Sequence, residues 1–309
     1  MQVGNIVVIR YIIKAACVAS ICATTVDIHI NRAVSEQAVP QTIEPADKLV
    51  NAGKAPKTIK NVLTVLNSAL EQAVKAQTIQ RNPAKFAKIP AVRVKDIHPL
   101  SPAEIVAFVD AAQDSPYYAP LMCCLFLGLR EGEALGLAWE HVDFENCKVH
   151  ICQQLQKDKA KGGLFYIQEG TKNGQSRILD VPDFLLEILQ EEKRRQLRAR
   201  LAAGPAWQNV WGLCFTDALG RCINPHTLWA NFKRIAASIG LPDARVHDLR
   251  HTNATLALVN GDDLKTVQAN LGHATAAFTL QRYVHASEAM KRASANRMQQ
   301  FFDDNVKKA

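Results

Sequence analysis

The feature that most constrains the fold is a change of hydrophobic period in the middle of the chain. On both sides of this stretch, apolar residues recur at the spacing of amphipathic helices. Between residues 149 and 181 they instead form three short runs, at 149–153, 164–167 and 176–181, which are typical of strands. Gly162-Gly163 and Lys172-Asn173-Gly174 separate these runs and favour tight turns. The sequence therefore predicts a mainly α protein with a small antiparallel β-sheet, in the α+β class.

Local signals mark where the helices begin. Ser101, Pro102 and Glu104 have the order of a capping box, with an N-cap serine, a proline at the first helical position and a glutamate at the third. Pro56 lies in the first turn of another helical pattern, which runs to about Gln77. The expected helices cover residues 56–77, 102–113, 117–128, 131–137, 183–200, 225–238, 247–259, 263–270, 276–285 and 287–303.

Length and charge indicate two domains and a polyanionic partner. A chain of 309 residues with 48% hydrophobic residues can bury two cores. Residues 48–95 contain ten Lys or Arg and a single acid, Glu71, and such a field attracts nucleic acid. We expect an N-terminal segment of unclear structure at 1–45, a small helical domain with a basic linker at 46–95, and a larger domain at 96–309.

The cysteines and apolar runs indicate the compartment. Eight cysteines include no C-x-x-C pair, which favours a reduced cytoplasmic protein over a disulfide framework or a zinc knuckle. The nearest candidate for a membrane span, residues 6–26, is interrupted by Arg10 and Lys14. We therefore expect a cytoplasmic protein without membrane contact.

Several residues could carry chemistry, although each signal is weak alone. His247 and Arg250 are three apart on an expected helix and so share a face. A guanidinium group offers a planar fork that suits phosphate oxygens. Arg130 lies in an apolar stretch and needs a partner, which could be a structural Glu131 or Glu133. His273 could simply end a helix, and an isolated tyrosine such as Tyr283 is most often a packing residue.

A second pattern in the same region suggests a metal site but does not fit one. His247 and His251 form an H-x-x-x-H pair, which places two histidines one helical turn apart, as in zinc proteases. However, Asp248 stands where such enzymes use glutamate, and Arg250 would put a positive charge beside the cation. We expect neither a metal nor a cofactor in this protein.

Taken together, five motifs in order resemble the tyrosine recombinase (phage integrase) family. The motifs are G-L-R-E-G-E-A-L-G-L at 128–137, T-K-N-G-Q-S-R at 171–177, H-D-L-R-H-T at 247–252, L-G-H at 271–273 and R-Y at 282–283. The resemblance covers most of residues 46–287. It implies a helical core-binding domain followed by a tyrosine-recombinase catalytic domain.

The resemblance also implies a role for each matching residue. Tyr283 would attack a DNA phosphate and form a 3′-phosphotyrosyl intermediate, and Arg130 and Arg250 would bind the non-bridging oxygens. Lys172 would protonate the leaving 5′-oxygen, and His247 would assist proton transfer. His273 would hydrogen-bond the phosphate, while Glu133 would support the site. The basic residues expected to contact DNA are Lys54, Lys57, Lys60, Lys75, Arg81 and Lys85.

The implied function is a site-specific recombinase that integrates or excises a mobile element such as a phage. Its expected partners are double-stranded DNA with attachment-type sites, three further copies of itself in a tetramer on DNA, and an accessory directionality factor. The alternatives are a chromosome-dimer resolvase, a type IB topoisomerase-like enzyme or a non-cleaving DNA-binding regulator. The filled set of catalytic positions argues against the regulator. The family's DNA-gripping domain usually has four helices, so the domain at 46–95 is either incomplete or completed by residues 1–45.

Overall fold

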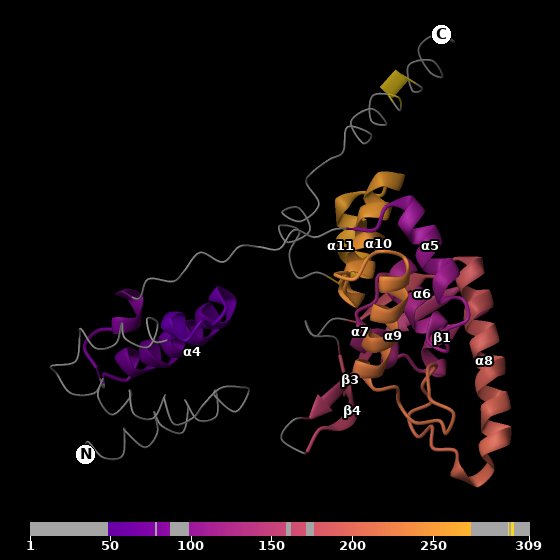
Figure 1. Ribbon diagram of the computed structural model, residues 1–309, viewed down its shortest axis with the longest axis horizontal. Helices are drawn as coiled ribbons and strands as arrows, with labels where there is room; N and C mark the ends of the chain where they lie inside the picture. The colour runs from indigo at the N-terminus through magenta and orange to yellow at the C-terminus, as the bar shows by residue number, and fades with distance from the viewer. Residues whose placement is uncertain are drawn as a thin grey trace. The chain divides into compact units, whose positions relative to one another are not determined.

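The computed structural model describes residues 49–77, 79–86, 99–158, 162–170 and 176–272, with 296, 298 and 299. The chain divides into two compact units, Met1–Lys95 and Asp96–Ala309 (Figure 1). The expected segment at 1–45 and the expected helix at 276–285 lie outside the described residues, as does nearly all of the helix expected at 287–303.

The described part of the first unit is built on one long helix. Helix α4 (Pro56–Lys75) begins at its N-terminal proline and ends two residues before the predicted end. Its apolar face buries Ile59, Leu63, Leu70 and Ala73. A short 3₁₀ helix, η1 (Pro83–Phe86), follows. The preceding Asn82 is buried and its side-chain amide donates to Asn67 Oδ1 and Glu71 Oε1, at 2.8 and 2.7 Å, which ties this turn to α4.

The second unit contains most of the helices that the sequence predicts. The capping box at Ser101 is present, since the Ser101 N–H donates to Glu104 Oε2 at 2.7 Å and the Glu104 N–H donates to Ser101 Oγ at 3.3 Å. The helices are α5 (Pro102–Ala112), α6 (Tyr118–Phe126), α7 (Glu131–Leu135), α8 (Asp183–Ala203), α9 (Pro225–Ser238), α10 (Val246–Asn260) and α11 (Leu264–Leu271), with 3₁₀ turns η2 (Trp139–His141) and η3 (Gly204–Ala206).

Helix α6 is the centre of the core. It is apolar on every side, and Leu121, Met122 and Leu125 are fully buried, as expected for a helix surrounded by protein. It packs against α8 and α10. In Figure 1, α8 runs along the outer edge of this unit, while α10 and α11 lie together at its upper end.

The strands differ from the prediction in number and pairing. Among the described residues there are five strands in two antiparallel sheets, ordered β1-β2-β5 and β3-β4, where three strands were expected. The expected strand at 149–153 divides at Cys152, because the chain changes partner there. The bounds are β1 (Val142–Asp143), β2 (Lys148–Ile151), β3 (Gln153–Asp158), β4 (Leu164–Glu169) and β5 (Arg177–Asp180).

A close approach between α7 and β3 joins the helices to the β3–β4 hairpin. A Cβ atom at Gly136 would lie 2.5 Å from the backbone nitrogen of Leu155 and 2.7 Å from the backbone of Gln154. Only glycine permits this spacing. Among the described residues, no helix is both long and apolar enough to cross a membrane.

Candidate active site

Glu133 lies at the centre of a buried cluster of arginines. Its side chain is fully buried on α7, and its Oε1 accepts a hydrogen bond from Arg130 Nη1 at 2.5 Å. The backbone N–H of Arg130 donates to Glu133 Oε2 at 3.0 Å, which caps the start of α7. Glu133, rather than Glu131, is therefore the partner that Arg130 needed.

A third residue of this cluster is Arg177, at the start of β5. Its Nη2 donates to Glu133 Oε2 at 2.7 Å, and its side chain is 8% exposed. Burial acts to raise the pKa of the Glu133 carboxyl, but the hydrogen bond and charge of Arg177, followed by those of Arg130, outweigh it and hold the pKa at about 2. Glu133 therefore carries its negative charge throughout the physiological range.

Arg177 was not among the residues that sequence reasoning selected. It stands at the end of the T-K-N-G-Q-S-R motif, which was interpreted only through its lysine. The sequence offered one signal for Arg177, which is a charged residue at the start of an expected strand. That strand must pack against a mostly apolar unit, so the charge needs a buried partner. Arg177 stands opposite Ile151 in the antiparallel pairing of β2 with β5, and this register directs its guanidinium group into the interior.

Arg250 is the second arginine that the sequence predicted, and it is the largest fully buried side chain among the described residues. It lies on α10, and its Nη1 donates to the carbonyl of Gly128 at 2.5 Å. Its Nη1 is also 3.9 Å from Glu133 Oε2. The structure thus brings Arg130, Arg250 and Glu133 together from positions up to 120 residues apart in sequence.

The three arginines also meet at the C-terminal end of α11. Arg177 Nε donates to the carbonyl of Asn270 at 2.7 Å, Arg250 Nη2 donates to that of Leu271, and Arg130 Nη2 donates to that of Gly272 at 3.3 Å. These carbonyls end a helix and carry its partial negative charge, which favours cations. The cluster therefore fixes the backbone immediately before His273.

Gly128 allows this convergence because its backbone has a positive φ of 63°. A Cβ atom there would lie 2.6 Å from the Leu271 side chain and 2.7 Å from Asn253 Oδ1. The turn after α6 can therefore approach α10 and α11 closely, and its carbonyl can reach Arg250.

His247 lies one helical turn before Arg250 on α10 and is exposed. Partial desolvation, followed by the positive charge of Arg250, lowers the pKa of its imidazole below the usual 6.5, and Arg130 adds to this effect. The ring is consequently neutral at pH 7 and able to accept a proton. Its ring centroid is 4.6 Å from that of His251, which is buried.

The geometry creates a site with excess positive charge. Three guanidinium groups surround one carboxylate, and Arg130 is the most accessible of them, with 23% of its side chain exposed. Such a site favours an anion, and the guanidinium geometry suits a phosphate group. Three of the predicted catalytic residues, Lys172, His273 and Tyr283, lie outside the described residues.

The predicted DNA-contacting residues all belong to the first unit. Each side chain is on the surface, and within the described part of the chain only Lys85 of this set pairs with a carboxylate, with its Nζ 2.9 Å from Glu71 Oε1. The predicted residues on the first unit are Lys54, Lys57, Lys60, Lys75, Arg81 and Lys85.

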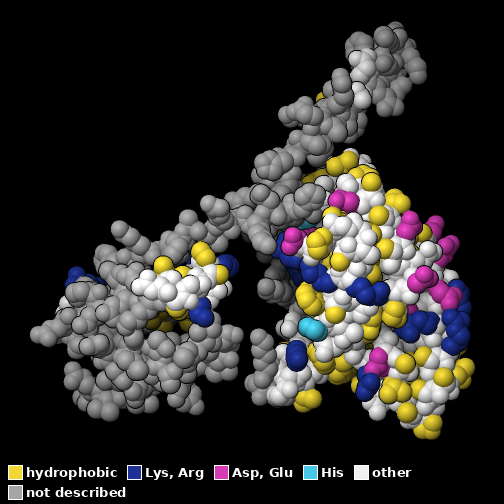
Figure 2. Space-filling view, in the orientation of Figure 1, with side chains coloured by type: hydrophobic (Ala, Val, Ile, Leu, Met, Phe, Trp, Pro, Cys, Tyr) yellow, Lys and Arg dark blue, Asp and Glu magenta, His cyan; other side chains and the backbone are white. Residues whose placement is uncertain are grey.

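In the second unit, Figure 2 shows Lys and Arg side chains gathered across the visible face, with most acidic side chains toward its right-hand edge.

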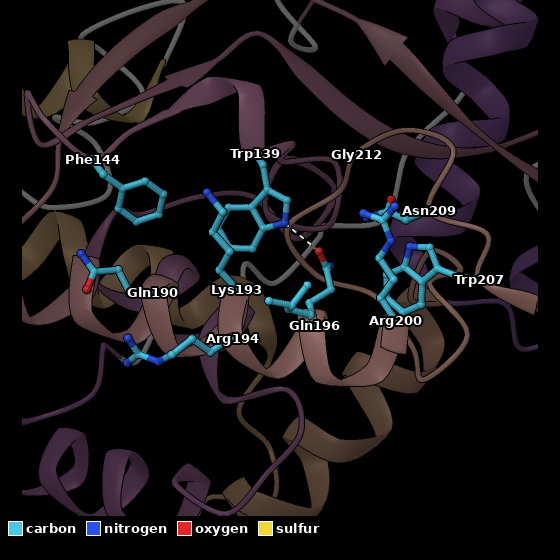
Figure 3. Close-up of a pocket in the computed structure, with 11 residues that line it drawn as sticks. Trp139, Phe144, Gln190, Lys193, Arg194, Gln196, Arg200, Trp207, Asn209 and Gly212 are labelled. Carbon is cyan, nitrogen blue, oxygen red and sulfur yellow. Dashed lines mark hydrogen bonds between the residues drawn. The ribbon is translucent and has the colours of Figure 1, made fainter. Parts of the chain in front are cut away.

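A separate hollow of about 630 Å³ lies beside α8 (Figure 3). Trp139 Nε1 donates to Gln196 Oε1 there at 2.7 Å. Lys193 Nζ lies 5.5 Å from the Trp139 ring and 5.1 Å from the Phe144 ring. None of the predicted catalytic residues lines this hollow, so it is distinct from the arginine cluster.

Comparison with known proteins agrees with the fold and the motifs. The sequence profile of the phage integrase family matches residues 99–290. A tyrosine recombinase XerC-like protein of Caldanaerobacter subterraneus subsp. tengcongensis is 30% identical, over 83% of this chain and 69% of the relative. An integrase of Saccharopolyspora erythraea is 25% identical, over 82% of this chain and 69% of the relative.

Solved structures share the fold at lower identity. The Tn1549 transposon integrase in complex with a circular intermediate DNA has a TM-score of 0.72 and 22% identity, covering 94% of this chain and 99% of that one. The XerH site-specific recombinase bound to palindromic difH substrate has a TM-score of 0.59 and 19% identity, covering 84% and 72%.

The mostly helical fold with small antiparallel sheets is that of the tyrosine recombinase catalytic domain. The chain belongs to the phage integrase family and is a site-specific tyrosine recombinase.

Proposed function

We propose that this recombinase integrates or excises a mobile element by transferring DNA strands through a 3′-phosphotyrosyl intermediate. In this proposal Arg130 and Arg250 bind the non-bridging oxygens of the scissile phosphate and stabilise the charge of the pentacoordinate transition state. Arg130 is the more accessible of the two, and the buried Arg250 supports the same site from α10. The observation that carries the proposal is the convergence of these arginines on Glu133.

The proton transfers are assigned to three further residues. Tyr283 attacks phosphorus, and the bond from phosphorus to the 5′-oxygen breaks. Lys172 gives its proton to the departing 5′-oxygen, and His247 accepts the phenolic proton, since its lowered pKa keeps the ring neutral at pH 7. His273 donates a hydrogen bond to the phosphate. Rejoining reverses these steps with a new 5′-hydroxyl, so the energy of the phosphodiester bond is conserved.

Binding is assigned to both units. The exposed basic residues of α4 and its flanks contact phosphates in a sequence-independent way. We further propose a homotetramer on paired attachment-type sites, with an accessory directionality factor, and a catalytic unit at 96–309 preceded by a core-binding unit at 46–95. Several relatives carry the name integrase, including those of Mycobacterium phages D29 and L5, which supports mobile-element integration.

A chromosome-dimer resolvase is the second candidate, because a XerC-like protein is among the relatives, at 30% identity. An integrase joins two different sites, whereas a resolvase acts on two identical sites. Recombination between plasmids that carry the DNA flanking the gene would separate the two. Product from unlike sites supports integration, and product only from identical sites supports resolution.

The chemistry is tested with a nicked suicide DNA substrate that traps the covalent intermediate. Wild-type protein should form a protein–DNA adduct that survives denaturation, and Tyr283→Phe should form none while binding DNA with nearly unchanged affinity. Tyr166→Phe is the matched control, because Tyr166 lies on β4, is 42% exposed and is not part of the proposed chemistry. An adduct formed by Tyr283→Phe would refute the assignment of the nucleophile.

A further inference from the structure

A cluster of three metal-binding side chains lies at the junction of the two sheets. His141, His150 and Cys152 each offer one ligand atom, and these atoms all lie within 4.8 Å of one another. None of the three belongs to the arginine cluster around Glu133. Little in the sequence indicates this cluster, because a turn and a strand separate His141 from His150 and Cys152.

The register of the first sheet produces this arrangement. Val142 pairs with Val149 across the β1–β2 ladder, and continuing that register by one position sets His141 opposite His150. Side chains alternate along a strand, so His150 and Cys152 emerge on the same face. The two imidazole rings consequently meet edge to face with centroids 5.8 Å apart.

We propose that His141, His150 and Cys152 bind a Zn²⁺ ion that has a structural role. Zinc takes imidazole nitrogen at about 2.0–2.1 Å and thiolate sulfur at about 2.3 Å, so tetrahedral ligands lie roughly 3.3–3.6 Å apart. His141 Nε2 and Cys152 Sγ are 3.3 Å apart, slightly closer than the roughly 3.5–3.6 Å of a nitrogen and a sulfur on one zinc ion. All three ligand atoms lie within 4.8 Å of one another and the side chains are only partly buried, so a bound ion would have to draw them together by about an ångström or less.

The surroundings favour a cation at this point. Glu140 Oε1 lies 3.7 Å from His141 Nε2, close enough to supply a fourth ligand or to hydrogen-bond a coordinated water. The carboxylate of Glu140 also brings a negative charge to this cluster, and that charge attracts a cation. A bound divalent cation offsets this negative charge and stabilises the thiolate.

The positions of the three proposed ligands in the fold indicate that a zinc ion would have a structural role. Cys152 is the residue at which the chain leaves the three-stranded sheet and enters the β3–β4 hairpin, and its carbonyl accepts a hydrogen bond from the Gly170 N–H at 2.7 Å. His141 belongs to η2, which precedes β1. Zinc would therefore link η2, β2 and the start of the hairpin at one point.

The test measures Zn²⁺ and Co²⁺ binding by the full chain. One tight equivalent of Zn²⁺ should bind, and Co²⁺ at the same site should show a thiolate-to-cobalt charge-transfer band in the near ultraviolet. At free Zn²⁺ about 100-fold above Kd, Tm should rise by roughly 5–10 °C. Loss of an outer-shell partner typically lowers the affinity for a metal by roughly 10- to 100-fold. Cys152→Ser and His150→Ala should each lower the Zn²⁺ affinity by more than this.

Matched controls are Cys222→Ser and His226→Ala, which alter a partly buried cysteine and a histidine elsewhere in the same unit. Both should retain the zinc affinity and the cobalt band. Zinc binding that is unchanged in Cys152→Ser, or a cobalt complex without the thiolate band, would overturn the proposal. Covalent capture of DNA by Cys152→Ser below its Tm should persist, so failure of the zinc site is distinguishable from failure of the recombinase chemistry.

Discussion

Replacing Glu133 with glutamine tests whether one carboxylate holds the arginine cluster together. The substitution preserves the size of the side chain but removes the negative charge that Arg130, Arg177 and Arg250 share. Three guanidinium groups would then occupy a buried region without this counter-ion. Removal of one partner from a buried ion pair typically costs about 3–5 kcal/mol.

The pKa of Glu133 gives an independent magnitude. Its pKa falls from 4.5 to about 2 on folding, and about 1.36 kcal/mol per pKa unit gives roughly 3 kcal/mol of stability at pH 7. Because the folded-state pKa is the lower one, this contribution is fully present above pH 4.5 and is lost as the pH falls toward 2. The two magnitudes agree, and for a domain of this size roughly 3 kcal/mol corresponds to a Tm decrease of about 6–12 °C.

The assay is urea and thermal unfolding of wild type and Glu133→Gln between pH 8 and pH 3. The difference in free energy of unfolding should be constant down to about pH 5 and should shrink below that. Glu191→Gln is the control, because Glu191 also accepts hydrogen bonds from two arginines but is 55% exposed, and its loss should destabilise the protein far less than the loss of Glu133. A difference below about 1 kcal/mol for Glu133→Gln at pH 7, or one that is insensitive to acid, would refute the reasoning.

Two further predictions concern proton transfer and DNA affinity. Because the pKa of His247 lies below 6.5, the cleavage rate should fall as the pH drops through a value under 6.5. The pH–rate profile of His247→Gln should not show this fall in rate at acid pH. If the fall persists in that variant, His247 is not the proton acceptor. Replacing both Lys57 and Lys60 with glutamine should weaken DNA binding at low salt and reduce the slope of log K against log salt by about 0.9 for each phosphate that is no longer neutralised. Lys148→Gln is the control, since Lys148 Nζ pairs with Asp180 at 2.5 Å, and an equal reduction of slope in that variant would argue against a specific role for the first unit.

Much of the fold followed from local signals in the sequence. The Ser101 capping box, the proline at the start of α4 and the apolar character of α6 act over a few residues, so they predicted helices to within a few residues. The strands were less predictable. The run at 149–153 was expected to be one strand, and only pairing with β5 on one side of Cys152 and with β4 on the other divides it between two sheets.

The sequence by itself determined the family and selected Arg130, Glu133, His247 and Arg250, because those residue types recur in motifs of fixed order. Only the tertiary structure decided that Arg177 also binds Glu133, and that three arginines bind successive carbonyls at the end of α11. It also brought His141 beside Cys152. The physical reason is that charge pairing and coordination depend on distances of a few ångströms between residues far apart in sequence, and these distances are set by packing and strand register.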